Sequence, residues 1–400
     1  MAGETDRGAC SGGAGEIEGT LSAQALAAAR LPLERAATLP REAYVSPEVY
    51  AREVERIFRR EWLCAGRVDQ LPEPGSHFPL DLLGEKLVVT RDERGEVRVL
   101  SRVCRHRAAE VVTKPGVARS LRCPYHAWTY ALDGRLLGAP LMDGVERFER
   151  AQCGLPEIRS EVWEGWIFVN FDPRAGALGP RLEPLRRSLA GFCMSEMVAT
   201  EPVVFDSPFN WKVLVDNFME AYHHIAVHRE TLEPLFPGKR SHVPDNQGPY
   251  SLLIMPTAGD EPAPAPFADG PPPATLEDWQ RSSLVAAVVY PFHLFAPGPD
   301  SLTWYQLLPE TWDRFTLRTY TCHPRAVIAD PAHADACAGL RAFVTTVHQE
   351  DIAACEAVWA GLGSPSSVPG RLSLLERAIW QFNQWWIDRM AERASPDRAP

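Results

Sequence analysis

The chain has 400 residues, 45% of them hydrophobic and 23% charged, which is the balance of a globular protein long enough for two domains. Its formal net charge of −11 argues against a nucleic acid or an anionic membrane as a partner. The sequence has neither a secretory signal nor a run of about 18 apolar residues, so we expect a cytoplasmic protein.

The first half of the chain is predicted to be mostly β-structure. Residues 1–20 are rich in glycine and polar side chains and are typical of a disordered segment. A helix capped by Ser46 is predicted over residues 46–62. Residues 87–100 place two strand-like segments around a charged turn and predict a hairpin. Short strand-like segments then continue to about residue 171.

The second half combines helices with longer strands. Four helices are predicted there, over residues 182–189, 211–228, 331–360 and 372–394. Residues 288–322 are strand-like, and the Pro-, Ala- and Gly-rich residues 262–273 are typical of a flexible loop. The expected fold class is therefore α+β, with an all-β domain followed by a domain in which helices cover a sheet.

Two closely spaced Cys-His pairs form the first candidate site. Cys104 and His106 are separated by one residue, and Cys123 and His126 by two. Two thiolates and two imidazoles fit a 2Fe–2S cluster with two Cys on one iron and two His on the other. A tetrahedral zinc site would use the same ligands, but zinc fingers usually pair Cys with Cys and His with His. The nine cysteines are an odd number in a long chain, which argues against a disulfide framework.

A group of histidines forms the second candidate site. His223, His224 and His228 follow Glu220 closely, and two His with one carboxylate make an iron site with open positions. Spacing alone leaves the pair open. Residues i and i+4 share a helix face, which favours His224 with His228. His223 and His228 converge only if the helix ends or bends between them. All three could also be core histidines.

A carboxylate from far along the chain could complete this site. In the predicted helix over residues 331–360, Asp351 lies within the apolar stripe. A buried carboxylate must be paired or metal-bound, so the alternatives are a metal ligand and a salt bridge to an arginine. Glu350 lies off the stripe, and we expect it to be solvated.

Both patterns resemble known motifs. Cys104-x-His106 and Cys123-x-x-His126 are similar to the Rieske motif, in a form without the two additional cysteines of the respiratory Rieske proteins. The segment Asn217-x-x-Glu220-x-Tyr222-His223-x4-His228 resembles the iron motif of Rieske oxygenase catalytic (alpha) subunits. This resemblance implies an all-β Rieske domain and a catalytic domain with an antiparallel sheet covered by helices.

The resemblance also implies roles for individual residues. Cys104, His106, Cys123 and His126 would hold the cluster. His223, His228 and Asp351 would hold a mononuclear Fe(II), with His224 only a neighbour. Asn217 and Glu220 would be catalytic, and Glu220 would connect a cluster histidine to His223, usually across a subunit boundary. The implied division is a tail and helix over residues 1–43, a Rieske domain over 44–178 and a catalytic domain over 179–400.

The implied function is that of a terminal oxygenase. It takes electrons from a separate NAD(P)H-dependent reductase, directly or through a ferredoxin, and activates O₂ to hydroxylate or demethylate a small organic substrate. The chain has no dinucleotide fingerprint of its own, and its acidic net charge is compatible with a basic electron donor. A homotrimer is expected. The alternatives are an aromatic-ring cis-dihydroxylating subunit and a non-catalytic Rieske electron-transfer protein.

The Glu at position 220 resembles the choline, carnitine and betaine branch and favours monooxygenation. A quaternary ammonium group could sit in an aromatic cage, although each ring alone is more often a core residue. The aromatic residues available to the catalytic half are Trp211, Trp279, Phe292, Phe295, Trp304, Tyr305, Trp312, Trp385 and Trp386.

Overall fold

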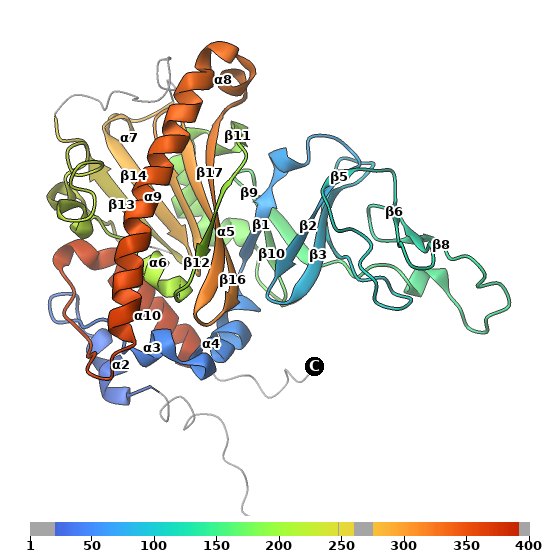
Figure 1. The fold of residues 1–400 in the computed structure, drawn as a ribbon, viewed down its shortest axis with the longest axis horizontal. Helices are drawn as coiled ribbons and strands as arrows, with labels where there is room; N and C mark the ends of the chain where they lie inside the picture. The colour runs from blue at the N-terminus through green and yellow to red at the C-terminus, as the bar shows by residue number, and fades with distance from the viewer. Residues whose placement is uncertain (1–20, 247, 260–274, 392–400) are drawn as a thin grey trace, which may run out of the picture.

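The computed structural model describes residues 21–246, 248–259 and 275–391 of the chain. Figure 1 shows a small lobe of short strands beside a larger lobe in which helices cover one broad sheet. The predicted α+β fold class is therefore confirmed. The predictions for residues 1–20 and 262–273 lie outside the described residues.

The small lobe contains three antiparallel sheets with the strand orders β1-β10-β9, β4-β3-β2-β5 and β6-β7-β8. The predicted hairpin is confirmed, because β3 and β4 pair with Val89 opposite Val99. The strands are β1 (Leu63–Arg67), β2 (Ser76–Leu82), β3 (Glu85–Arg91), β4 (Val97–Ser101), β5 (Gly116–Val117), β6 (Leu121–Arg122), β7 (Thr129–Tyr130), β8 (Leu136–Gly138), β9 (Arg159–Trp163) and β10 (Trp166–Asn170).

The larger lobe is built on a seven-stranded sheet with the order β11-β17-β16-β15-β14-β13, in which β12 also pairs with β17. All of its pairs are antiparallel. The strands are β11 (Met197–Ala199), β12 (Val203–Ser207), β13 (Tyr250–Pro256), β14 (Ser283–Val289), β15 (His293–Pro297), β16 (Leu302–Thr311) and β17 (Arg314–Pro324).

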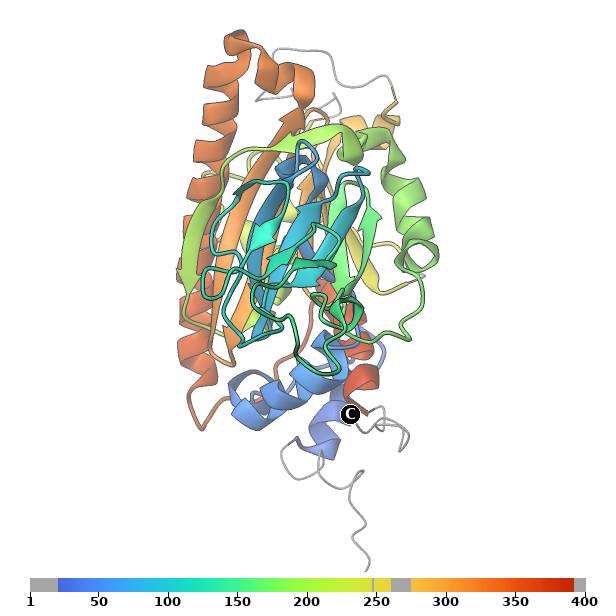
Figure 2. The same ribbon diagram turned by 90° about the vertical axis from the view of Figure 1, so that its right-hand side faces the viewer.

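Long and short helices surround this sheet. They are α2 (Ala23–Ala29), α3 (Glu42–Val45), α4 (Pro47–Glu53), α5 (Leu178–Leu189), α6 (Trp211–Phe218), α7 (Asp278–Arg281), α8 (Arg325–Ala329), α9 (Ala334–Leu362) and α10 (Arg377–Ala391). Helix α9 crosses the sheet in Figure 1 and packs on α6 and β17, while α10 packs on β13 and α2. Figure 2 shows α5 and α9 on opposite sides of the molecule. None of the helices described here has the length and apolar character to cross a membrane.

An apolar junction joins the two lobes. Trp166 and Phe168 of β10 pack edge-on against His293 of β15, with ring centroids 4.8 and 4.9 Å apart. Phe295 follows two residues later on β15 and lies 4.8 Å from Trp166. This wall of aromatic rings fixes the small lobe against the seven-stranded sheet.

The helices predicted over residues 46–62 and 211–228 both end earlier than expected. Ser46 caps α4 by accepting the N–H of Val49 at 3.2 Å, as expected, but the helix becomes a π-helical turn and ends at Phe58. The helix predicted over residues 211–228 is wrong beyond Phe218, where α6 ends. The two C-terminal helices are confirmed as α9 and α10.

Two candidate metal centres

The two Cys-His segments of the small lobe form two matching loops. In the first, the N–H of Cys104 donates to Ala109 at 2.9 Å, and the N–H of Ala108 donates back to Cys104 at 3.0 Å. In the second, Cys123 N–H donates to Trp128 at 2.8 Å, and Ala127 N–H donates to Cys123 at 3.1 Å. Ala108 and Ala127 both have φ of +58°. One turn geometry is thus used twice, once for each pair of candidate ligands.

Of the four candidate cluster ligands, the two cysteines are buried and the two histidines lie nearer the surface. Cys104 and Cys123 are buried, at 3% and 2% exposure, whereas His106 is exposed and His126 is half-buried. The two imidazole rings lie 4.6 Å apart, and His106 stacks on Trp128 at 4.9 Å. Two inner thiolates and two outer imidazoles fit a 2Fe–2S cluster whose histidine-bound iron faces the surface.

Tyr130 supports the inner half of this arrangement. Its hydroxyl oxygen lies 3.2 Å from Sγ of Cys104 and accepts the backbone N–H of Arg105 at 3.0 Å. A thiolate can only accept, so the hydroxyl donates to Cys104 when that sulphur binds iron. Such hydrogen bonds to cluster sulphurs are among the features that set a cluster's reduction potential.

The second site begins where α6 ends. Glu220 folds back, and its Oε2 accepts the backbone N–H groups of Tyr222 and His223, the latter at 3.1 Å. These bonds start a tight turn over Tyr222–Ile225 in place of a further α-helical turn. His223 and His228 are therefore not on one regular helix, which removes the objection to their five-residue spacing.

Three ligand atoms converge at this turn. Nε2 of His228 lies 2.9 Å from Oδ1 of Asp351, and Nε2 of His223 lies 3.6 Å from the same oxygen. One ligand atom from each residue lies within 4.8 Å of the other two. Asp351 reaches the site from the buried face of α9, and its partners among the described residues are histidines rather than an arginine.

A further carboxylate holds the other nitrogen of each histidine. Nδ1 of His223 lies 2.5 Å from Glu220, and Nδ1 of His228 lies 2.7 Å from Glu350. With the proton on Nδ1, each Nε2 lone pair is free for a metal. The expectation that Glu350 is solvated was wrong, because its Oε2 also accepts the Thr231 hydroxyl at 2.7 Å. Helical periodicity could not show this contact, since the histidine comes from another element.

The electrostatics of the site favour a cation. Burial alone would raise the pKa of Asp351, but its hydrogen bond with His228 and the nearby histidine charges hold that pKa below its usual value. Burial favours neutral His228, yet Asp351 and Glu350 outweigh it and raise the pKa of that imidazole. Three carboxylates thus surround two imidazoles, and a divalent cation would balance their charge.

His224 also lines the cavity beside this site but is not one of the three residues whose ligand atoms converge. It is buried, and its Nδ1 donates to the carbonyl of Phe236 at 3.0 Å. Burial lowers the pKa of His224 to about 4. Its role as a neighbour of the ligands stays a prediction.

A cavity of about 160 Å³ opens beside the three ligand residues, and Asn217 and Glu220 also lie on its wall. The wall is largely apolar. Of the rings considered for an aromatic cage, Tyr305 lines this cavity, while Trp211 and Trp304 are core residues. Sequence periodicity did not identify the other rings of the wall, which are Phe218, Phe236 and Phe343.

The surface around the cluster loops is basic, although the whole chain is acidic. Residues 101–150 carry nine Arg or Lys against five Asp or Glu. Five exposed cations near the loops form no ion pair with any residue that the structure describes. They are Arg105, Arg107, Lys114, Arg119 and Arg122. The net charge of −11 therefore gave a misleading picture of this face.

Family comparisons agree with both sites. Residues 61–149 match the Rieske [2Fe-2S] domain, and residues 194–392 match the catalytic domain of the ring hydroxylating alpha subunit. These families carry a Rieske cluster and a mononuclear iron, so the zinc alternative for the first site is not supported.

The curated relatives are oxygenase subunits. The carnitine monooxygenase oxygenase subunit of Acinetobacter baumannii is 34% identical over 189 residues, which cover 46% of this chain and 51% of the relative. The chain thus spans about half the length of the first such relatives. The glycine betaine monooxygenase oxygenase subunit of Chromohalobacter salexigens aligns over 89% of this chain and 86% of its own length at 27% identity.

Solved structures share the fold. A quaternary ammonium Rieske monooxygenase superposes with a TM-score of 0.78 at 24% identity, covering 92% of this chain and 98% of that one. Naphthalene 1,2-dioxygenase from Rhodococcus sp. superposes with a TM-score of 0.76 at 20% identity, covering 96% and 99%. With a Rieske domain followed by a ring-hydroxylating alpha-subunit catalytic domain, this chain belongs to the Rieske non-haem iron oxygenases.

Proposed function

We propose that the chain is a terminal oxygenase that hydroxylates or oxidatively demethylates a small organic substrate. The observation that carries this proposal is the arrangement of His223 and His228, each held between an outer carboxylate and Asp351. Two histidines and one carboxylate on one side of a cavity leave positions for O₂ and substrate. When bound there, Fe(II) supplied with electrons through the cluster activates O₂ for insertion into a C–H bond.

The protein's own residues hold and orient these centres. Cys104, His106, Cys123 and His126 hold the cluster, and His223, His228 and Asp351 hold the iron. Glu220 fixes the ring of His223 through Nδ1 and lies beside Asn217 on the cavity wall. The apolar wall excludes water from the reacting carbon.

The substrate is a small molecule that fits this cavity. Relatives are named for carnitine, glycine betaine and choline, which all carry a trimethylammonium group. Monooxygenation is favoured over ring cis-dihydroxylation because the relatives named for carnitine, glycine betaine and choline are monooxygenases.

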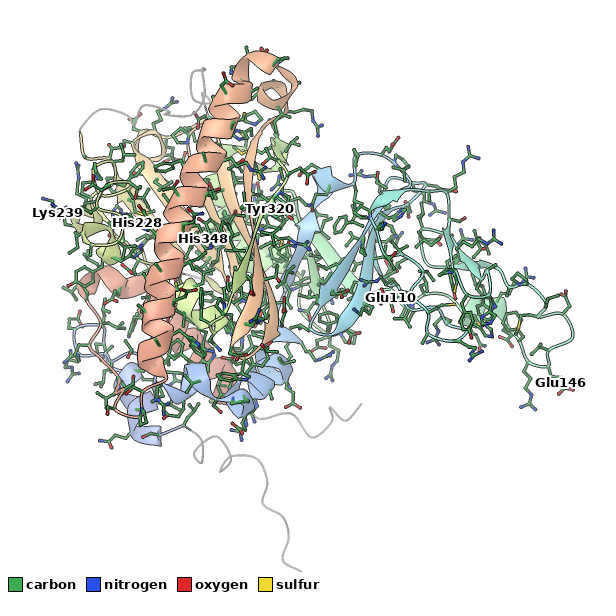
Figure 3. All side chains as sticks on the ribbon, viewed as in Figure 1. Glu110, Glu146, His228, Lys239, Tyr320 and His348 are labelled. Carbon is green, nitrogen blue, oxygen red and sulfur yellow. The ribbon has the colours of Figure 1, made fainter. Side chains whose placement is uncertain are left out.

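A homotrimer is proposed because the two sites lie in different lobes. Figure 3 places His228 in the larger lobe, whereas Glu110, which follows the first cluster loop, lies in the smaller lobe. Electrons would reach the iron of a neighbouring subunit, with Glu220 of one subunit accepting a hydrogen bond from His126 of the next. One solved structure with this fold is described as giving insight into inter-subunit electron transfer.

The electron donor is proposed to be a separate NAD(P)H-dependent reductase, acting directly or through a ferredoxin. The basic surface around the cluster loops favours a donor with an acidic docking face. The acidic net charge of the whole chain is compatible with a basic donor, but the local surface favours an acidic one.

The test is turnover of the purified protein with a generic reductase, NADH, ¹⁸O₂ and a panel of trimethylammonium and aromatic substrates. We expect about three irons per chain and one labelled oxygen atom in the product. Asp351→Ala should lose the mononuclear iron and the product while the visible absorption of the cluster persists. Incorporation of both oxygen atoms would establish the dioxygenase alternative, and two irons without any product would establish the electron-transfer alternative.

Subunit mixing tests the trimer. Cys123→Ala removes the cluster and His228→Ala removes the iron site, so each variant alone should be inactive. If electrons cross between subunits, coexpressed mixtures should regain a clear fraction of the activity. A mixture as inactive as its parents would contradict the inter-subunit path.

A further inference from the structure

The turn between β15 and β16 places a carboxylate on the wall of the cavity. The N–H of Gly298 donates to the carbonyl of Ser301 at 2.8 Å and closes the turn. Asp300 lies within it, is 8% exposed and lines the same cavity as His223 and His228. The sequence pattern does not single out Asp300, because an acidic residue in a Gly-Pro-Asp-Ser turn is typical of a solvated loop.

The two oxygens of Asp300 differ. Oδ1 accepts the hydroxyl of Ser301 at 3.2 Å. Oδ2 is buried and has no hydrogen-bond partner within the part of the chain that the structure describes. A buried carboxyl oxygen without a partner costs free energy, so this oxygen is matched to a group that the protein itself does not supply.

Among the residues that the structure describes, no basic side chain forms an ion pair with Asp300. Residues 260–274 contain no Lys, Arg or His. Burial raises the pKa of Asp300, which is the behaviour of a carboxylate that lacks a compensating charge.

We propose that Asp300 binds a positively charged ammonium group of the substrate, and that this pairing selects organic cations over neutral molecules of the same shape. The proposal rests on the proposed function, since it names the class of substrate for the same cavity. The remaining wall suits the uncharged part of such a molecule. It offers aliphatic side chains such as Val344 and Val347, and the rings of Phe218 and Phe343, which attract a cation as well as alkyl groups.

The anchor would also orient the substrate. The carboxylate lies in the β15–β16 turn, whereas the candidate iron ligands come from the turn after α6 and from α9. A cation held at Asp300 leaves the rest of the molecule free to extend into the cavity towards those ligands. Asp300 is thus a binding and specificity residue.

The experiment compares choline with its neutral carbon isostere 3,3-dimethylbutan-1-ol. Binding to the oxidised holoenzyme is measured by calorimetry without reductant, so no turnover occurs. We expect wild type to bind choline at least tenfold more tightly than the isostere. Asp300→Asn should lose at least tenfold in choline affinity and change the affinity for the isostere by less than about twofold.

Asp206→Asn is the matched control. It removes the same charge from an exposed aspartate on β12, which pairs with Arg314 outside the cavity. This variant should bind both probes as wild type does. Equal affinity of wild type for the two probes, including failure to bind either, would overturn the proposal without any variant having to fold. So would a loss in Asp300→Asn that is the same for both probes.

Failure of this inference can be told apart from failure of the proposed function. Cation binding without oxygenated product would leave Asp300 as a cation site and remove the oxygenase assignment. Turnover of neutral substrates by a protein that binds both probes equally would keep the oxygenase assignment and remove Asp300 as a cation site.

Discussion

Nδ1 of His228 lies 2.7 Å from Oε2 of Glu350, so neighbouring residues of α9 bind opposite ends of one imidazole. Asp351 faces Nε2, where a metal would bind, and Glu350 fixes the tautomer and the ring from the other side. The Thr231 hydroxyl holds the same oxygen of Glu350 in place. Of these two adjacent acidic residues, Asp351 is a candidate metal ligand, and Glu350 holds the ring of a second candidate ligand, His228.

Loss of Glu350 should weaken iron binding without touching the cluster. We expect Glu350→Ala to raise the Fe(II) dissociation constant by about 10- to 100-fold, and Glu350→Gln to have a smaller effect because it keeps an acceptor oxygen. The measurement is anaerobic Fe(II) titration of protein with an intact cluster spectrum. Glu356→Gln, at an exposed position of the same helix, is the control. Unchanged affinity in Glu350→Ala would mean that the ring is held by packing alone.

Glu220→Gln should leave both centres loaded and slow the transfer of electrons between them. Its Oε1 holds Nδ1 of His223 at 2.5 Å, and a neutral amide would hold it more weakly. We expect a decrease of about 10- to 100-fold in product formed per second in single-turnover experiments with a prereduced cluster. Glu230→Gln, an exposed change close by, should behave as wild type. A normal single-turnover rate in Glu220→Gln would remove this carboxylate from the path.

The sequence identified the types of ligand better than their surroundings. Residue type and spacing identified both Cys-His pairs, and the apolar stripe of α9 placed Asp351 on a buried face, as the structure has it. The pattern could not predict that α6 ends at Phe218, because the apolar periodicity continues while the side chain of Glu220 takes over backbone N–H groups.

Hydrophobic periodicity could not predict contacts between segments that are distant in the sequence. Glu350 was expected to be solvated, and no pattern in the sequence singled out Asp300. Glu350 contacts His228, which lies more than a hundred residues away in the chain. Asp300 lies in the wall of the cavity. A helical wheel or a turn signal describes only the local backbone, so it cannot report such neighbours.

The basic surface around the cluster loops should make cluster reduction dependent on salt. With an acidic donor, the second-order rate of reduction should fall steeply as ionic strength rises, because screening shortens the range of attraction. Lys114→Glu with Arg119→Glu should lower that rate about tenfold at low salt and flatten its salt dependence. Both side chains are exposed, and both residues lie in the segment of the sequence that joins the two cluster loops.

Stopped-flow absorbance of the cluster provides this measurement. Arg325→Glu, a change at an exposed position of α8 in the other lobe, should leave the rate near that of wild type. If the Arg325 variant slows reduction as much as the double variant, the net charge of the whole protein steers the donor, and the basic surface around the cluster loops does not.

His293 should make the protein less stable in acid. Burial among the rings of Trp166 and Phe168, together with the charge of Arg67, lowers the pKa of His293 to about 3. In the unfolded chain that pKa is about 6.5. The group therefore contributes stability that is fully present above pH 6.5 and is lost, at about 1.4 kcal/mol per pH unit, as the pH falls towards 3.

Replacing the imidazole by a ring that does not titrate isolates this effect. His293→Phe should have a higher melting temperature than wild type at pH 5, and the gap should exceed that at pH 7.5. At pH 5 the proton-linked part amounts to about 2 kcal/mol. Because neither ring nitrogen of His293 has a hydrogen-bond partner among the described residues, the variant leaves no polar group unpaired. His242→Gln, at an exposed histidine, should keep the wild-type difference between the two pH values. If His293→Phe and wild type differ in melting temperature by the same amount at pH 5 and pH 7.5, the buried imidazole takes up no proton on unfolding.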